Sequence, residues 1–339
     1  MTEPTALDIF EAKRRLAPYL QATPLLPSSW LSSIADGNVF LKIESLNLTN
    51  SFKIRGAMNA VLKLMESHGM EGEGFSPRQE AAKAPSLRAL PTLVTASAGN
   101  HGRALALAAE RLGLACVVFT PETAPETKQN AIRRHGAILH ADCEDYDIAE
   151  KRAKEFAEAE GGVYISPYNH PDVIAGAGTI GLEIVEAMPD FDCIVVPLGG
   201  GGLASGVGLA VKAGASRATV VGVEVEASSP FTLSLEAGRI TEITPRASLA
   251  DGLIGNLEPG SITFPVVKKV VDYVVTVSED DLMRAMKGLA TEEHLIVEGA
   301  GVAATAAVMA GKASAPGQRV VVLITGANVD LPKWLFTIS

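Results

Sequence analysis

The chain has few cysteines and no long apolar run. Its three cysteines, Cys116, Cys143 and Cys193, lie far apart in 339 residues, without a Cys-x-x-Cys pair. We therefore expect neither a disulfide framework nor a zinc site. No apolar run reaches membrane-spanning length, and the N-terminus has no basic segment followed by an apolar one. These absences predict no signal peptide, no membrane partner and a cytoplasmic location.

Positive charge is also in short supply. The chain carries 29 lysine and arginine residues against 39 aspartate and glutamate residues, a formal net charge of -10. Because nucleic-acid binding needs clustered basic side chains to neutralise phosphates, we expect no nucleic-acid partner. Hydrophobic residues make up 47% of the sequence and charged residues 20%, which is typical of a well-buried globule. A small-molecule partner is favoured.

Strand-like and helical segments alternate along most of the chain, which predicts an α/β fold. The strands are too apolar to face water, which indicates parallel sheets covered by helices on both faces. A stretch rich in glycine, proline and charge, residues 68–91, is predicted to be an inserted surface loop. The expected strands fall near residues 39–43, 93–96, 116–120, 137–140, 163–166, 193–198, 220–225, 273–277 and 320–325. The expected helices fall near residues 7–20, 101–112, 127–135, 148–159, 176–188 and 203–213.

The segment from Ser51 to Gly56 places a lysine where a strand-like run gives way to a helical one. We expect a helix to begin near Lys53, with Ser51 as its N-cap. The positive end of a helix disfavours a cation, which leaves two interpretations. Either Lys53 and Arg55 are surface groups that turn into water, or Lys53 acts as a neutral amine, for example in imine formation with a carbonyl cofactor.

Four consecutive glycines follow an apolar strand-like run and precede a helical one. Without side chains, their N–H groups can converge on an anion, which predicts a phosphate at a helix N-terminus. These glycines are Gly199, Gly200, Gly201 and Gly202.

The same loop leaves a second interpretation open. Gly199, Gly201 and Ala204 also fit the G-x-G-x-x-A fingerprint of dinucleotide-binding folds, and Glu224 stands where a ribose-binding acid would sit. This pattern keeps a nicotinamide-dependent dehydrogenase as an alternative. Against it, the unit lies far into the chain and gives Lys53 no role.

Two more loops of small polar residues follow strand-like runs. The first, Ser97-Ala98-Gly99-Asn100-His101, offers a hydroxyl, a carboxamide and backbone donors that could bind a carboxylate at a helix N-terminus. An N-cap followed by a turn is an equally good interpretation of this loop alone. The second, Thr325-Gly326-Ala327-Asn328, offers another hydroxyl and amide at the end of the last strong strand.

Taken together and in this order, these stretches resemble the fold-type II pyridoxal-phosphate enzymes. The serine/threonine dehydratase and serine racemase family is the most similar branch, and the resemblance runs from Thr23 to Asn328. It implies a two-lobed α/β fold like that of the tryptophan synthase β subunit. Residues 1–66 and 170–339 would form a large cofactor-binding lobe, and residues 67–169 a small lobe that closes on substrate. It also implies a homodimer.

The resemblance assigns a role to each loop. Lys53 would bind pyridoxal 5'-phosphate covalently, with Phe52 packed near the ring. Asn100 would bond the ring hydroxyl, and Thr325 the ring nitrogen. The N–H groups of the four glycines would hold the phosphate. The substrate carboxylate would be bound by the loop that contains Ser97, Ala98, Gly99, Asn100 and His101.

The activity that follows from these roles is β-elimination. L-threonine, L-serine or a related 3-hydroxy amino acid such as hydroxyaspartate would give a 2-oxo acid and ammonia, with Lys53 as the base. A neutral hydroxyl from Thr325 at the ring nitrogen makes the cofactor a weaker electron sink, which favours prompt loss of the β-hydroxyl.

Other activities of the same fold stay open. They are racemisation of serine or aspartate, β-replacement synthesis and non-catalytic ligand binding, although an intact Lys53 disfavours the last. Racemases of this branch use a second serine as proton donor, and Ala98 occupies that position here. We therefore expect racemisation to be poor.

A metal site and the substrate-selecting residues are less well defined by the sequence. Glu224 and Ser228 match part of a divalent-cation site found in some relatives, but Pro230 replaces its aspartate, so we expect no metal. Tyr168, Asn169, His170 and residues near Asp251 are candidates for contacting the β-substituent, and spacing alone does not rank them.

Overall fold

The computed structural model describes residues 2–69, 90–97, 99–215 and 217–339 of the chain. Most of the predicted inserted loop, and Ala98, therefore lie outside the described residues. Within the described part, no helix is long and apolar enough to cross a membrane. All three cysteines are free and buried.

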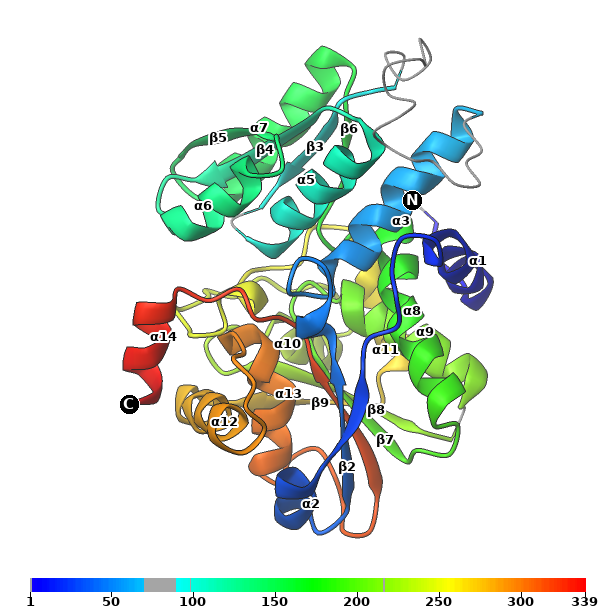
Figure 1. The fold of residues 1–339 in the computed structure, drawn as a ribbon, viewed down its shortest axis with the longest axis vertical. Helices are drawn as coiled ribbons and strands as arrows, with labels where there is room; N and C mark the ends of the chain where they lie inside the picture. The colour runs from blue at the N-terminus through cyan, green and yellow to red at the C-terminus, as the bar shows by residue number, and fades with distance from the viewer. Residues whose placement is uncertain (1, 70–89, 98, 216) are drawn as a thin grey trace.

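A six-stranded sheet forms the larger half of the fold (Figure 1). Its strand order is β1-β2-β10-β7-β8-β9, and every pair is parallel except β1 with β2. The antiparallel edge strand β1 was not predicted, because Pro27 and its short length give it no strand signal. The strands are β1 (Leu25–Ser28), β2 (Asn38–Ile43), β7 (Cys193–Pro197), β8 (Thr219–Val225), β9 (Tyr273–Val277) and β10 (Arg319–Ile324).

Helices bury both faces of this sheet. In β10, Val320 and Val322 join the core under α13, while Val321 and Leu323 join the core under α9, as the period of two requires. The helices on the α13 side are α2 (Ser29–Ala35), α12 (Glu279–Glu292), α13 (Gly299–Met309) and α14 (Leu331–Ile338). Those on the other side are α1 (Ala6–Leu16), α8 (Pro171–Ala187), α9 (Gly202–Gly214), α10 (Pro230–Ala237) and α11 (Thr263–Val270).

A four-stranded parallel sheet forms the smaller half, at the top of Figure 1. Its order is β5-β4-β3-β6, with α5 and α6 on one face and α7 on the other. The strands are β3 (Leu93–Ala96), β4 (Cys116–Pro121), β5 (Ile138–Cys143) and β6 (Val163–Tyr164). The helices of this half are α5 (Asn100–Leu112), α6 (Glu126–Arg133) and α7 (Tyr146–Glu160), and α3 (Lys53–Ser67) packs between the two halves.

The predicted fold class is confirmed: parallel sheets are covered by helices on both faces. Helix limits were less accurate than strand positions. The first helix ends at Leu16 instead of near residue 20, and α8 begins at Pro171 instead of near residue 176. The earlier start follows from the sequence, since proline suits the first turn and the His170 ring accepts a hydrogen bond from the Asp172 N–H.

The strand order brings the predicted loops together. In the larger sheet β10 lies between β2 and β7, so the carboxyl ends of these three strands are adjacent. The segments that follow them lead to Lys53, Thr325 and the four glycines. Ligands of open α/β sheets bind at such an edge. Helix α3 starts at this edge and packs against both α8 and α5, next to the smaller sheet.

Candidate active site

A cavity of about 820 Å³ lies between the two sheets. Every predicted cofactor- and substrate-binding residue that the structure describes lines it. These residues are Phe52, Lys53, Ser97, Gly99, Asn100, His101, Gly199, Gly200, Gly201, Gly202 and Thr325. Ala98, the remaining predicted residue, lies outside the described residues.

Lys53 is the first residue of α3, and its amine is buried in the cavity wall. Its Nζ donates a hydrogen bond to the Pro167 carbonyl at 2.8 Å and lies 5.0 Å from the centroid of the Phe52 ring. Among the described residues, no carboxylate forms an ion pair with it. Burial lowers the pKa of Lys53 to about 8, and the charge of Glu298 partly opposes this shift. The amine is therefore much more readily neutral than an ordinary lysine.

The expectation that Ser51 caps α3 was wrong. The N-cap position belongs to Phe52, and no side chain caps the helix. Ser51 is fixed by an isolated antiparallel bridge to Gly326, and its buried hydroxyl has no hydrogen-bond partner among the described residues. The surface interpretation is also excluded, because Arg55 is only 2% exposed and forms ion pairs with Glu44 and Glu183.

The glycine loop opens α9 in a way that only glycine allows. A Cβ added to Gly200 would lie 2.4 Å from the Tyr168 ring, and one on Gly201 would lie 2.5 Å from Phe231. Gly201 also has a φ of 86°, which side chains rarely adopt. Among the described residues no side chain caps α9, and Gly202, its first residue, lines the cavity, so the N–H groups at the start of the helix have no capping partner. This arrangement fits a phosphate group.

Asn100 is held in one orientation by a network that crosses the molecule. Its Nδ2 donates to Glu298 Oε1 at 2.6 Å, and its Oδ1 accepts from Asn328 Nδ2 at 2.7 Å. The Asn328 backbone N–H also donates to Glu298 Oε2 at 3.1 Å. The second N–H of the Asn100 amide is left for a partner in the cavity, which fits the ring hydroxyl of the cofactor.

Glu298 is the site residue that sequence reasoning missed. Burial raises the pKa of its carboxyl to about 7, and the nearby charge of Asp251 adds to this shift. Lys128 and the hydrogen bonds from Asn100 and Asn328 act in the opposite direction. The sequence signal was an acid within Val297-Glu298-Gly299, just before the apolar helix α13, but that position alone suggests an N-cap.

The Ser97 loop ends at a helix N-terminus that no side chain occupies. Gly99 is the N-cap of α5, and no side chain caps that helix. His101 is buried, with Nε2 3.2 Å from the Ile165 carbonyl, and burial lowers its pKa to about 3. The ring is therefore neutral, so the loop offers hydrogen bonds and a helix dipole but no full positive charge.

Glu224 does not face the cavity. Its carboxylate accepts hydrogen bonds from the Phe231 N–H at 2.7 Å and from the Thr232 N–H at 2.8 Å, which caps the start of α10. The Thr232 hydroxyl donates to the same carboxylate at 2.6 Å, so both oxygens of Glu224 are engaged by the start of α10. Ser228, the second residue of the suggested metal site, bonds the backbone of Gly255.

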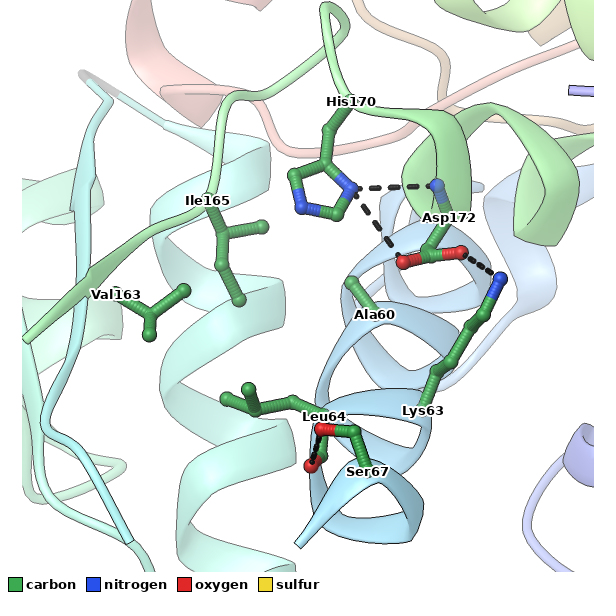
Figure 2. Close-up of a pocket in the computed structure, with 8 residues that line it drawn as sticks. All are labelled: Ala60, Lys63, Leu64, Ser67, Val163, Ile165, His170 and Asp172. Atoms are coloured by element: carbon green, nitrogen blue, oxygen red, sulfur yellow. Dashed lines mark hydrogen bonds and ion pairs between the residues drawn. The ribbon is translucent and has the colours of Figure 1, made fainter. Parts of the chain in front are cut away.

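The structure separates the candidates for substrate selection, of which Asp251 lines the large cavity. Tyr168 lines the large cavity beside the glycine loop, and Asn169 is buried with its Oδ1 accepting from the Ile262 N–H. His170 instead lines a second cavity of about 210 Å³ between α3 and the strand that leads into α8 (Figure 2). There its ring faces Asp172, which pairs with Lys63 at 2.8 Å. Of the three, Tyr168 is therefore in reach of a substrate.

Comparison with known proteins decides the family. The family described as pyridoxal-phosphate dependent enzyme matches residues 16–326. The chain belongs to this family. The resemblance inferred from the loops is thus confirmed, and so is the cofactor, pyridoxal 5'-phosphate.

The relatives of this pyridoxal-phosphate-dependent enzyme are named for two kinds of activity, deamination of L-threonine and racemisation. The L-threonine ammonia-lyase of Thermotoga maritima is 38% identical over 96% of this chain and 76% of its own. The catabolic L-threonine dehydratase of Escherichia coli K12 is 36% identical over 97% and 95%. The crystal structure of a pyridoxal 5'-phosphate-dependent aspartate racemase matches with a TM-score of 0.85, at 32% identity over 99% of both chains.

Proposed function

We propose that this enzyme deaminates L-threonine, L-serine or a related 3-hydroxy amino acid by pyridoxal-phosphate-dependent β-elimination. The observation that carries the proposal is Lys53, a buried amine with a pKa lowered to about 8 that shares a cavity with an uncapped glycine loop. The two relatives named for L-threonine support the substrate class. Both a base and an anion site are required for this reaction.

The residues around the cavity suit the cofactor group by group. Lys53 would hold its carbonyl carbon, and the N–H groups at the start of α9 would hold its phosphate. Thr325, at the end of β10, would bond the ring nitrogen, and the remaining N–H of Asn100 would bond the ring hydroxyl. When bound, pyridoxal phosphate supplies an electron sink that acidifies the substrate's α-proton.

The protein's own groups then complete the elimination. The start of α5 binds and orients the substrate carboxylate, so that the α-proton points at Lys53. Neutral Lys53 Nζ removes this proton, and the β-hydroxyl takes up a proton from a donor beside the phosphate site and leaves as water. The Lys53 ammonium then returns the α-proton to that donor, so that the protons balance. The unsaturated amine that is released hydrolyses to the 2-oxo acid and ammonia.

One set of measurements tests this function. The purified protein should absorb in the visible range as an imine-bound cofactor does, and borohydride should abolish that absorbance by reducing the Lys53 linkage. The same protein should release 2-oxobutanoate from L-threonine or pyruvate from L-serine, within a panel that includes 3-hydroxyaspartate. Visible absorbance without 2-oxo acid from any member of the panel would leave the cofactor in place and refute the elimination.

Racemisation is the second candidate, favoured by the aspartate racemase structure. Ala98 argues against it, because a methyl side chain cannot return a proton on the opposite face of the substrate. Chiral analysis of the products of L-serine decides between them. We expect pyruvate to form faster than D-serine, and the reverse order would favour the racemase.

We also propose the two lobes and the assembly that the resemblance implies. Residues 1–66 and 170–339 would move relative to residues 67–169 and close the cavity, which is supported by the two separate sheets. A homodimer is supported by exposed apolar side chains on α14, where Phe336 is 86% exposed. Three free cysteines suit a cytoplasmic location. Light scattering tests the homodimer, and cell fractionation tests the cytoplasmic location.

A further inference from the structure

Lys128 reaches the wall of the large cavity from α6, on the side of the smaller sheet. Its Nζ forms an ion pair with Asp251, which begins the short helix η3 (Asp251–Leu253) on the opposite wall. The side chain of Lys128 is 19% exposed, whereas that of Asp251 is 59% exposed. The cation is thus partly buried, and its anionic partner sits at the more accessible side.

The ammonium group lies directly beside the loop that we assign to the substrate carboxylate. A Cβ built on Gly99 would lie 3.4 Å from Lys128 Cδ and 3.7 Å from Lys128 Nζ. Gly99 is the N-cap of α5, so Lys128 Nζ lies next to the N-terminus of this helix. A carboxylate bound there would meet N–H groups and a full positive charge together.

The charge of the cavity makes this cation necessary. Among the described residues that line it, seven are aspartate or glutamate, none is arginine, and Lys53 and Lys128 are the two lysines. Lys53 is engaged by the cofactor, and His101 is neutral. A substrate carboxylate would therefore be repelled by the wall unless Lys128 paired with it.

We propose that Lys128 binds the α-carboxylate of the amino acid substrate, which displaces Asp251 from the ion pair. This inference rests on the proposed function and adds a specificity-determining residue to it. Because an ion pair with an exposed carboxylate is weak, the exchange costs little. Asp251 thereby competes with the substrate and holds Lys128 in position while the site is empty.

The competing explanation is that the pair only ties the two walls together. A second pair provides the control, since Lys154 on α7 contacts Glu258 at 3.2 Å across the same gap. Lys154 does not line the cavity and is 44% exposed. Removing it breaks a comparable tie without removing a cation from the carboxylate site.

The test uses the holoenzyme and two ligands that have no β-leaving group, L-alanine and L-alaninamide, titrated by the change in cofactor absorbance. Lys128→Met should weaken L-alanine binding by roughly tenfold or more, the value of a lost charged hydrogen bond. L-alaninamide, which lacks the carboxylate, should bind Lys128→Met and the parent equally. Asp251→Asn should tighten L-alanine, Lys128→Arg should restore part of its affinity, and Lys154→Met should change neither ligand.

Three results would overturn the inference. The first is that Lys128→Met and Lys154→Met weaken the binding of L-alanine and of L-alaninamide to the same extent. The second is that Lys128→Met binds L-alanine as tightly as the parent. The third is that Asp251→Asn binds L-alanine more weakly than the parent. If Lys128→Met fails to load cofactor, Lys128→Arg and Asp251→Asn still decide. Failure of the proposed function is a separate observation, namely wild-type enzyme that binds L-alanine but releases no 2-oxo acid from L-threonine.

Discussion

Lys53 and Arg55 lie two residues apart in the first turn of α3; Arg55 is buried, and Lys53 is half-buried with its amine desolvated. Residues at this spacing point to nearly opposite sides of a helix. Lys53 points into the cavity, where its Nζ bonds the Pro167 carbonyl. Arg55 points toward the core, where Glu44 binds its guanidinium through two bonds of 2.8 Å and Glu183 binds it as well.

Burial lowers the pKa of both cations, but the net shift is downward for Lys53 and upward for Arg55, because only Arg55 has carboxylate partners in contact among the described residues. Burial lowers the pKa of Lys53 to about 8 and makes a neutral, nucleophilic amine accessible. Burial also opposes the charge of Arg55, but Glu44 and Glu183 more than offset it and raise the pKa of the guanidinium. The first turn of α3 thus carries Lys53, whose amine is readily neutral, and Arg55, whose ion pairs hold the helix against the core.

Removing Lys53 should have the largest effect on activity. Lys53→Ala should lower the rate of 2-oxo acid release by roughly 10⁴-fold, because the variant would lose both the proposed cofactor linkage and the proposed general base. The measurement is 2-oxo acid formation from L-threonine at saturating cofactor. Lys63→Ala, on the same helix but paired with Asp172 outside the cavity, is the matched control and should stay active. Substantial turnover by Lys53→Ala would contradict the assignment.

Breaking the Arg55 cluster should instead affect stability. Glu44 is fully buried, so Glu44→Gln leaves Arg55 with a missing charge and should lower the free energy of unfolding by about 3–5 kcal/mol. Urea denaturation of the cofactor-free protein measures this loss. Glu66→Gln removes a 45% exposed partner of Arg15 and should cost only about 0–1 kcal/mol. Equal losses would mean that burial does not distinguish these pairs.

Replacing Lys53 by methionine should change stability in the opposite direction. The native pKa near 8 lies below the ordinary value of 10.5, so the protonated amine destabilises the folded state. This cost is fully present below pH 8 and disappears as the pH rises toward 10.5. At pH 7, Lys53→Met should therefore stabilise the cofactor-free protein by about 1–3 kcal/mol. A stability gain that does not vary between pH 7 and pH 10.5 would contradict this explanation.

The features of the fold and the site that could be predicted from the sequence are those that neighbouring residues encode. The α/β fold was predictable because Val320 to Ile324 and similar runs encode buried strands locally. The loops after β2, β7 and β10 were predictable because their residues are consecutive. That they line one cavity follows from a strand order that places β10 between β2 and β7, which only the family resemblance implied.

Features made by distant residues were not predictable. Glu298 acquires its environment from Asn100, which is 198 residues away, and Asn328 completes that network. Ser51 had the right residue type and position for an N-cap, yet its bridge to Gly326 prevents that role. In each case a contact formed by folding overrode the local pattern, and no periodicity in the chain reports such a contact.

The smallest expected effect concerns Glu298, the carboxylate that influences the pKa of Lys53 among the described residues. The charge of Glu298 raises the pKa of Lys53, a weaker version of what Glu44 does to Arg55. Glu298→Gln should therefore lower the pKa of Lys53 and shift the pH midpoint of its reaction with trinitrobenzenesulfonate to lower pH in the cofactor-free protein. Glu258→Gln, another acid of the cavity wall, is the control and should leave the midpoint unchanged.

Whether the midpoint shifts depends on the charge state of Glu298 itself. With a pKa raised to about 7, Glu298 is ionised only above neutral pH, which includes the range in which Lys53 titrates. An unchanged midpoint in Glu298→Gln would mean that the carboxyl is protonated there and exerts no charge on Lys53. A downward shift would mean that its charge keeps the amine partly protonated, so that the contrast between Lys53 and Arg55 is one of degree, set by the distance to a carboxylate.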